Sequence, residues 1–244
     1  MPAATDWVRR IFRNAAVAAL GLALAGGLAA FQFGLTPRGM YRSGESQDNL
    51  TRINPHAVPL VGSPDAPYVI MLLFDYKCPH CQRVHALLND AIRPYDGKLA
   101  FALCPAPLNT QCNPYVSRDP SEFKDSCELA RIGLAVWAAN RDAFFVFDRW
   151  MFSPEPGQRW RPRNLEAARA KAVELLGKAK FDAARADPWI DRYMQSSIQV
   201  FGDTIQGGNA VPKLVFGSRW VIPEPNNADD LVLILQDSLA VPTP

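Results

Sequence analysis

A strand-like apolar run that passes directly into a Cys-x-x-Cys motif is the feature that most constrains the fold of this 244-residue chain. Residues 68–73 form the apolar run, residues 74–81 read Phe-Asp-Tyr-Lys-Cys-Pro-His-Cys, and residues 82–92 have helical character. Two cysteines three apart at such a junction form a redox motif. The first sulfur then lies beside unpaired N–H groups at the positive end of a helix, which favours the thiolate. We therefore expect Cys78 to be the nucleophile and Cys81 the resolving thiol.

The N-terminal segment has the character of a membrane anchor. Three arginines within residues 9–13 precede residues 15–35, which contain no charge and one strongly polar side chain, Gln32. About 20 apolar residues span a bilayer as a helix, and arginines before the span predict a cytoplasmic N-terminus, residues 1–14. The alternative is a cleaved signal peptide, with residues 23–25 (Ala-Leu-Ala) as the cleavage site. Either arrangement exports the remaining chain to an oxidising compartment.

The order of expected elements defines the fold class. Residues 36–54 are expected to be a polar tether. After it the pattern predicts a strand, a helix and a strand, then a helical block, then two strands and a helix. The expected ranges are 68–74, 79–93 and 99–104; 121–140, 143–152, 165–176 and 188–201; and 213–216, 219–222 and 228–240. This order predicts an α/β, thioredoxin-like fold (55–113 and 205–244) with an inserted helical subdomain (114–204).

A second motif precedes the expected strand at 213–216. Pro212 stands just before this strand, where a proline in the second half of such a fold can be cis. Placed opposite the Cys-x-x-Cys turn, it would expose the Val211 backbone for pairing with an extended polypeptide. The alternative is an ordinary loop proline that enters an edge strand.

These motifs resemble a known family. Cys78-Pro79-His80-Cys81 together with Val211-Pro212 is similar to the DsbA-type thiol–disulfide oxidoreductases, and three stretches resemble the thioredoxin-like domains fused to bacterial vitamin K epoxide reductase homologues: 61–67, 107–113 and 127–131 with Trp137. The resemblance implies an oxidising enzyme without a cofactor, in which Pro79 and His80 tune the thiolate. It also implies reduced extracytoplasmic proteins as substrates and a quinone-linked membrane enzyme as the re-oxidising partner.

One position departs from the family pattern. Members commonly carry a buried carboxylate six residues before the nucleophile, and Leu72 occupies that position here. Strand alternation places the charged neighbours Asp75 and Lys77 on the opposite face from Leu72. We therefore assign no general base from the sequence.

Three further cysteines complete the five in the chain. Cys112 and Cys127 are expected to pair, closing a loop of about 15 residues worth roughly 3 kcal/mol in the chain-entropy model. Cys104 ends an apolar strand and is expected to be a buried free thiol. The other two pairings of these three cysteines stay open, as does a relay that passes electrons from Cys78 and Cys81 to a second pair.

The expected function is donation of the Cys78–Cys81 disulfide to folding proteins in the periplasm by a single-pass protein of the inner membrane. One alternative is a reductase or isomerase for a dedicated client such as apocytochrome c. Another is a copper-handling chaperone in which His85, one helical turn after Cys81, joins the two cysteines; a redox-dead binding module is a third. A net charge of +2 gives no field that favours nucleic acid, so basic and aromatic residues at 159–163 are read as a solvated or lipid-facing surface.

Overall fold

The computed structural model describes residues 43–45, 53–118 and 120–244 of the chain, which belong to the unit Tyr41–Pro244. The expected cytoplasmic segment 1–14 and the expected anchor 15–35 lie outside the described residues. In the part that is described, no helix is both long enough and apolar enough to cross a membrane.

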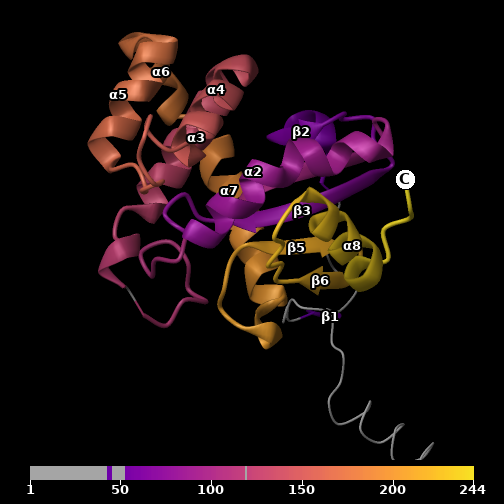
Figure 1. Cartoon of the computed structure of the whole chain (residues 1–244). Helices are drawn as coiled ribbons and strands as arrows, with labels where there is room; N and C mark the ends of the chain where they lie inside the picture. The colour runs from indigo at the N-terminus through magenta and orange to yellow at the C-terminus, as the bar shows by residue number, and fades with distance from the viewer. Residues whose placement is uncertain (1–42, 46–52, 119) are drawn as a thin grey trace, which may run out of the picture. The chain divides into compact units, whose positions relative to one another are not determined.

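A six-stranded mixed sheet with the order β1-β6-β5-β3-β4-β2 forms the framework (Figure 1). Its central strand β3 (Tyr68–Phe74) runs parallel to β4 (Leu99–Pro105) and antiparallel to β5 (Lys213–Phe216). The outer strands are β2 (Leu60–Gly62), which pairs with β4, and β6 (Arg219–Val221), which pairs with β5. The last five residues of β3 and all seven of β4 are buried, as expected for strands covered on both faces.

The strand β1 (Ser43–Glu45) corrects the expectation that residues 36–54 form only a tether. It pairs antiparallel with β6, and Gly44 faces Trp220 across the ladder. An edge strand presents unpaired N–H and C=O groups, which any short extended segment can satisfy. This pairing depends on backbone groups and leaves no apolar pattern in the sequence.

Helices cover the sheet on the side of the Cys-x-x-Cys motif. The helix α2 (Pro79–Ile92) follows β3 directly and packs against the C-terminal helix α8 (Ala228–Leu239), which also contacts β6. Figure 1 shows α8 lying over β5 and β6. The strand–helix–strand order expected around the two cysteines is therefore confirmed.

The helical insertion contains α3 (Ser126–Ala139), α4 (Arg141–Phe152), α5 (Leu165–Leu176) and α6 (Lys178–Arg185). The next helix, α7 (Pro188–Asp203), packs against β4. The sequence analysis did not predict α6, an eight-residue helix in which Phe181 is the only buried side chain. The sequence predicted α-helix from residue 121, but residues 121–125 are not α-helical. A 3-10 turn (Ser121–Phe123) precedes α3 instead.

Candidate active site

Cys78 is the N-cap residue of α2 and therefore stands where the backbone N–H groups of the first helical turn are free. Its backbone is extended (φ −83°, ψ 119°), and Pro79 occupies the first helical position, where a missing N–H does no harm. The first helical bond runs from the Gln82 N–H to the Cys78 carbonyl oxygen at 3.2 Å. The sequence around the motif thus dictates locally that this sulfur lies at a helix start.

The environments of the two thiols shift their pKa values in opposite directions. The pKa of Cys78 is lowered chiefly by a hydrogen bond from the Cys81 thiol, with help from the backbone N–H groups of Cys81 and His80 and against the effect of burial. The pKa of Cys81 is raised well above its ordinary value, first by complete burial and then by Cys78. Cys78 is thus the more acidic thiol of the pair and Cys81 the less acidic one; their roles as nucleophile and resolving thiol stay a prediction.

Val211 and Pro212 lie directly against this thiol pair. The Val211–Pro212 peptide bond is cis, and the Cys78 thiol donates a hydrogen bond to the Val211 carbonyl oxygen at 3.3 Å. Val211 is only 4% exposed, and its carbonyl oxygen is the atom that contacts the Cys78 thiol; pairing of its backbone with an extended polypeptide stays a prediction. The exposed part of the same loop is Asn209 and Ala210.

Asp75 is a buried carboxylate beside the thiol pair, to which the sequence argument assigned no role. It is 2% exposed, and its carboxylate accepts hydrogen bonds from the Lys77 and Leu108 N–H groups, both at 2.7 Å, and from the Ser126 hydroxyl at 2.9 Å. Alternation along β3 does not apply to it, because the strand ends one residue earlier at Phe74. A carboxylate directly after a buried strand was the available signal.

The position of Asp75 couples it to both sulfurs. Its own N–H donates to the Cys81 sulfur at 3.5 Å, and the charge of its carboxylate raises the pKa of Cys78 and of Cys81. Burial raises the pKa of Asp75 itself, although its three hydrogen bonds and Lys77 act in the opposite direction. Leu72 is fully buried apolar core. The site therefore has a buried carboxylate, three residues before the nucleophile instead of six.

The exposed tip of the motif is formed by Pro79 and His80. The His80 ring nitrogen Nδ1 lies 2.7 Å from a guanidinium nitrogen of Arg83, one turn along α2. The contribution of His80 to the low pKa of Cys78 comes through its backbone N–H. The tuning role expected for His80 therefore has a backbone component that the side-chain chemistry did not predict.

His85 does not join the cysteines, contrary to the copper-chaperone alternative. Its ring packs at a tilt of 32° against Phe152 with the centroids 4.0 Å apart, and its Nδ1 lies 3.5 Å from the Asp148 carboxylate. Tyr76 donates to the other oxygen of Asp148 at 2.9 Å. In the described residues no three His, Cys, Asp or Glu side chains are placed to hold a metal ion together. The cluster instead ties the catalytic loop and α2 to α4 of the insertion.

The remaining cysteines lie in two different environments. Cys112 and Cys127 form a disulfide with an S–S distance of 2.10 Å, the pairing favoured above. Cys104 is a fully buried free thiol on β4, where burial raises its pKa to about 12 and its sulfur lies 3.4 Å from the Tyr193 hydroxyl. A relay between the two cysteine pairs stays a prediction.

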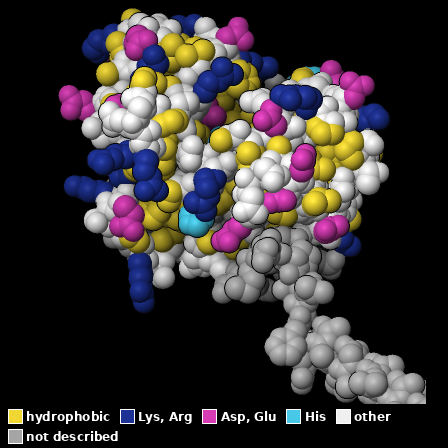
Figure 2. Space-filling view, viewed as in Figure 1, with side chains coloured by type: hydrophobic (Ala, Val, Ile, Leu, Met, Phe, Trp, Pro, Cys, Tyr) yellow, Lys and Arg dark blue, Asp and Glu magenta, His cyan; other side chains and the backbone are white. Residues whose placement is uncertain are grey.

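The basic and aromatic stretch at 159–163 is engaged in contacts within the chain. Arg163 lies over the Trp150 ring at 4.7 Å and pairs with Glu155 at 2.6 Å, while the Trp160 indole donates to the Met151 carbonyl oxygen at 3.0 Å. Figure 2 shows Lys and Arg side chains gathered over the helical insertion on the face in view. The aromatic residues in these contacts, Trp150 and Trp160, pack within the chain. They therefore do not form the stacking platform that single-stranded nucleic acid requires.

Comparison with known proteins agrees with this architecture. A thioredoxin family model matches residues 55–237, and a search of curated proteins gives no match. A thioredoxin-like oxidoreductase from Silicibacter pomeroyi DSS-3 is similar in structure at 18% identity (80% of this chain, 99% of that chain, TM-score 0.57). So are the catalytic domain of Proteus mirabilis ScsC at 20% identity (80% and 94%, 0.53) and the thiol–disulfide exchange protein alpha-DsbA2 from Wolbachia pipientis at 18% identity (74% and 86%, 0.55). The expected thioredoxin-like fold is thereby confirmed.

Proposed function

This chain belongs to the thioredoxin family, and from that premise we propose that it is a thiol–disulfide oxidoreductase that donates the Cys78–Cys81 disulfide to folding proteins. In this proposal the catalytic part works in the periplasm, held at the inner membrane by residues 15–35. The three arginines before that segment and the long chain after it support this orientation.

The observation that carries the proposal is the opposite shift of the two thiol pKa values. A lowered pKa at Cys78 stabilises the reduced protein, because the thiolate exists only when the disulfide is broken. The size of this stabilisation sets the oxidising strength: the nucleophilic cysteine has a pKa of about 7 in thioredoxin and about 3.5 in DsbA, and their potentials lie near −270 mV and −120 mV. That gap corresponds to roughly 7 kcal/mol, which is large enough to decide the direction of exchange.

The proposed reaction proceeds through a mixed disulfide. A client thiolate attacks the Cys78 sulfur, the Cys78–Cys81 bond breaks, and the Cys81 sulfur leaves and takes up a proton, which its raised pKa favours. A second client thiolate then attacks the client sulfur of the mixed disulfide, and Cys78 leaves as a stabilised thiolate. Two electrons pass from the client to the protein, and one client disulfide is formed.

The contact between Cys78 and Val211 adds a binding step to this sequence. While reduced Cys78 is protonated, its thiol donates a hydrogen bond to the Val211 carbonyl oxygen. Neither a disulfide-bonded Cys78 nor its thiolate has an S–H to donate, so in both states this carbonyl can accept an N–H from an extended client strand. Client binding at the cis-proline loop would then compete only with the protonated thiol, which is absent from the oxidised protein.

Re-oxidation in this proposal falls to a quinone-linked membrane enzyme, which the resemblance to domains fused to vitamin K epoxide reductase homologues supports. The nearest rival keeps the fold and reverses the direction, as a reductase or isomerase for a client such as apocytochrome c. The separation of His85 from the cysteine pair argues against the copper-handling rival.

The equilibrium constant of the Cys78–Cys81 pair against a glutathione series tests the proposal. A potential close to that of DsbA is expected, and one near that of thioredoxin would end the donor assignment in favour of the reductase. The measurement is best made with Cys104→Ala, which removes the third free thiol; the high pKa of Cys104 predicts that this substitution leaves the potential unchanged.

A further inference from the structure

Lys213 is a fully buried lysine at the edge of the active site that the proposed chemistry does not use. It is the first residue of β5, directly after the cis Val211–Pro212 bond, and is 0% exposed. Its ammonium group donates to the Thr204 carbonyl oxygen at 2.8 Å, to the Thr204 hydroxyl oxygen at 3.1 Å and to the Gly208 carbonyl oxygen at 3.3 Å. A buried charge with three acceptors, none of them a carboxylate, requires a reason.

Two aromatic rings complete the surroundings of this group. The Nζ atom lies 4.9 Å from the centroid of Phe201 and 5.1 Å from that of Trp220, within the range of cation–π attraction. Burial lowers the pKa of Lys213 to about 8. The three acceptors and the two rings together form a closed cage for one ammonium group.

The acceptors show what this cage does to the chain. Thr204 is the first residue after α7 and Gly208 lies in the following loop, so the Lys213 side chain reaches back and binds both. It caps the carbonyl end of α7, where a cation is favoured. It also closes the segment 204–213 into a stapled loop, whose far side is fixed by the pairing of Lys213 with Leu73 of β3.

Val211 and the exposed residues Asn209 and Ala210 lie inside this stapled loop. The Val211 carbonyl oxygen is the group that contacts the Cys78 sulfur. A loop held at Gly208 on one side and in the sheet on the other has little freedom, and that reduces the ordering that a binding partner must supply.

We propose that Lys213 is a positioning residue for polypeptide clients, whose side chain holds the 204–212 loop so that the edge at residues 209–211 pairs with an extended client strand beside Cys78. This inference rests on the proposed function and adds a residue that acts on client binding and not on sulfur chemistry. Small thiols, which need no strand pairing, do not depend on it.

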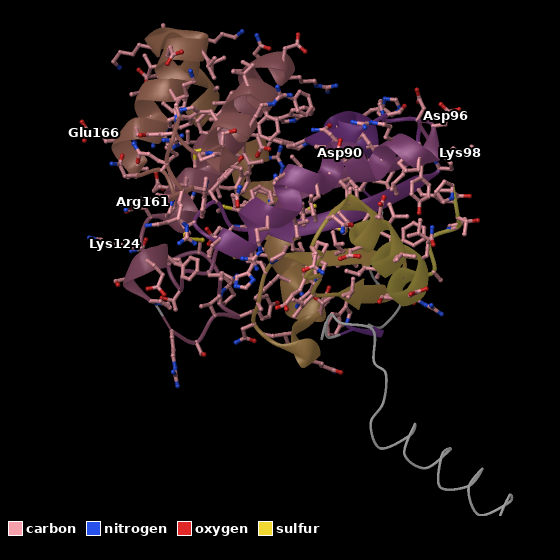
Figure 3. The ribbon with its side chains drawn as sticks, in the orientation of Figure 1. Asp90, Asp96, Lys98, Lys124, Arg161 and Glu166 are labelled. Atoms are coloured by element: carbon pink, nitrogen blue, oxygen red, sulfur yellow. A yellow bond between two sulfur atoms is a disulfide. The ribbon has the colours of Figure 1, made fainter. Side chains whose placement is uncertain are left out.

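The test is Lys213→Met, which keeps an unbranched side chain one atom shorter and removes the donors. The matched control is Lys98→Met, since Lys98 is an exposed lysine in the turn before β4 (Figure 3). Each pre-oxidised protein reacts in a single turnover with reduced ribonuclease A over a range of concentrations, and separately with glutathione. The half-saturating client concentration, the limiting rate and the glutathione equilibrium constant are measured.

For Lys213→Met we expect the half-saturating client concentration to rise about tenfold, the equivalent of one lost hydrogen bond of ~1.4 kcal/mol. The limiting rate, the glutathione rate and the glutathione equilibrium constant should each stay within about twofold. Lys98→Met should match the wild type throughout. An unchanged half-saturating concentration, or a parallel change in the glutathione equilibrium constant, would overturn the inference.

If Lys213→Met does not fold, Thr204→Val replaces it, because valine keeps the backbone acceptor and removes only the hydroxyl, which accepts from Lys213 and donates to the Val200 and Phe201 carbonyl oxygens. Its half-saturating concentration should rise about threefold with the glutathione constant unchanged, and no rise would again refute the inference. Failure of the proposed function gives a different result, since the wild-type protein itself would then not oxidise ribonuclease A.

Discussion

The buried ammonium group of Lys213 makes a quantitative prediction about stability and pH. A lysine that is buried without a carboxylate partner has a folded pKa of about 8, against an ordinary value of 10.5. Between these two values the unfolded chain binds more protons than the folded chain, so stability rises with pH in this window. Lys213→Met removes the titration and should abolish this part of the pH dependence.

The magnitude follows from the two pKa values. A difference of 2.5 units corresponds to about 3.4 kcal/mol of destabilisation, which is almost fully present near pH 7. Near pH 9.5 the folded lysine is neutral and about 1.4 kcal/mol remains. The wild type should therefore gain about 2 kcal/mol relative to Lys213→Met over this range. Unsatisfied acceptors at Thr204 and Gly208 add a constant offset to the variant and do not alter the difference.

Urea unfolding of both proteins at several pH values measures this difference, because every other titrating group is common to both and cancels. The stability of the wild type minus that of the variant should rise by about 2 kcal/mol between pH 7 and 9.5, whatever the size of the offset. Parallel curves, within about 0.5 kcal/mol, would mean that the ammonium group is as well solvated in the folded protein as in the unfolded chain. The cage described for Lys213 would then be wrong.

Three further single substitutions and one double variant test the active site and its support. Cys81→Ala removes the hydrogen bond that most lowers the pKa of Cys78, so alkylation of Cys78 across a pH series should show a raised pKa; a lower value would contradict the assigned donor. Asp75→Asn removes a charge that raises the pKa of Cys78, so alkylation near pH 6 should become faster, whereas slower alkylation would exclude the coupling. Gly133→Ala brings a Cβ within 2.7 Å of the Tyr76 hydroxyl and should destabilise the protein by about 1–3 kcal/mol in urea unfolding. Adding Tyr76→Phe should make the sum less than additive; full additivity would place the two side chains out of contact.

Local patterns in the sequence were sufficient for most of the framework. The helix Leu165–Leu176 and the strands Tyr68–Phe74 and Lys213–Phe216 have the ranges that apolar periodicity, turn residues and prolines predict. The sequence analysis did not predict the strand β1 or the helix α6. The strand β1 depends on backbone pairing with β6, and α6 buries only Phe181.

The candidate site divides in the same way. The position of Cys78 at a helix N-terminus could be predicted from its neighbours in the chain. A strand precedes it, and a proline that begins a helix follows it. The location of Asp75 does not follow, since its hydrogen-bond donors Leu108 and Ser126 come from later segments that only the folded chain brings together. Strand alternation predicts the direction of a side chain only within the strand. Beyond the end of β3, tertiary contacts determine where a side chain lies.

By itself, then, the sequence determined the redox pair, the order of strands and helices around it and the proline that faces it, because these depend on residues adjacent in the chain. Only the tertiary structure decided which groups surround the two sulfurs and what fixes the loop beside them. Lys213 shows the reason: its acceptors at Thr204 and Gly208 and its rings at Phe201 and Trp220 become neighbours only when α7 and β6 pack around β5. Burial and charge at a site are properties of that packing and are not encoded at any one position.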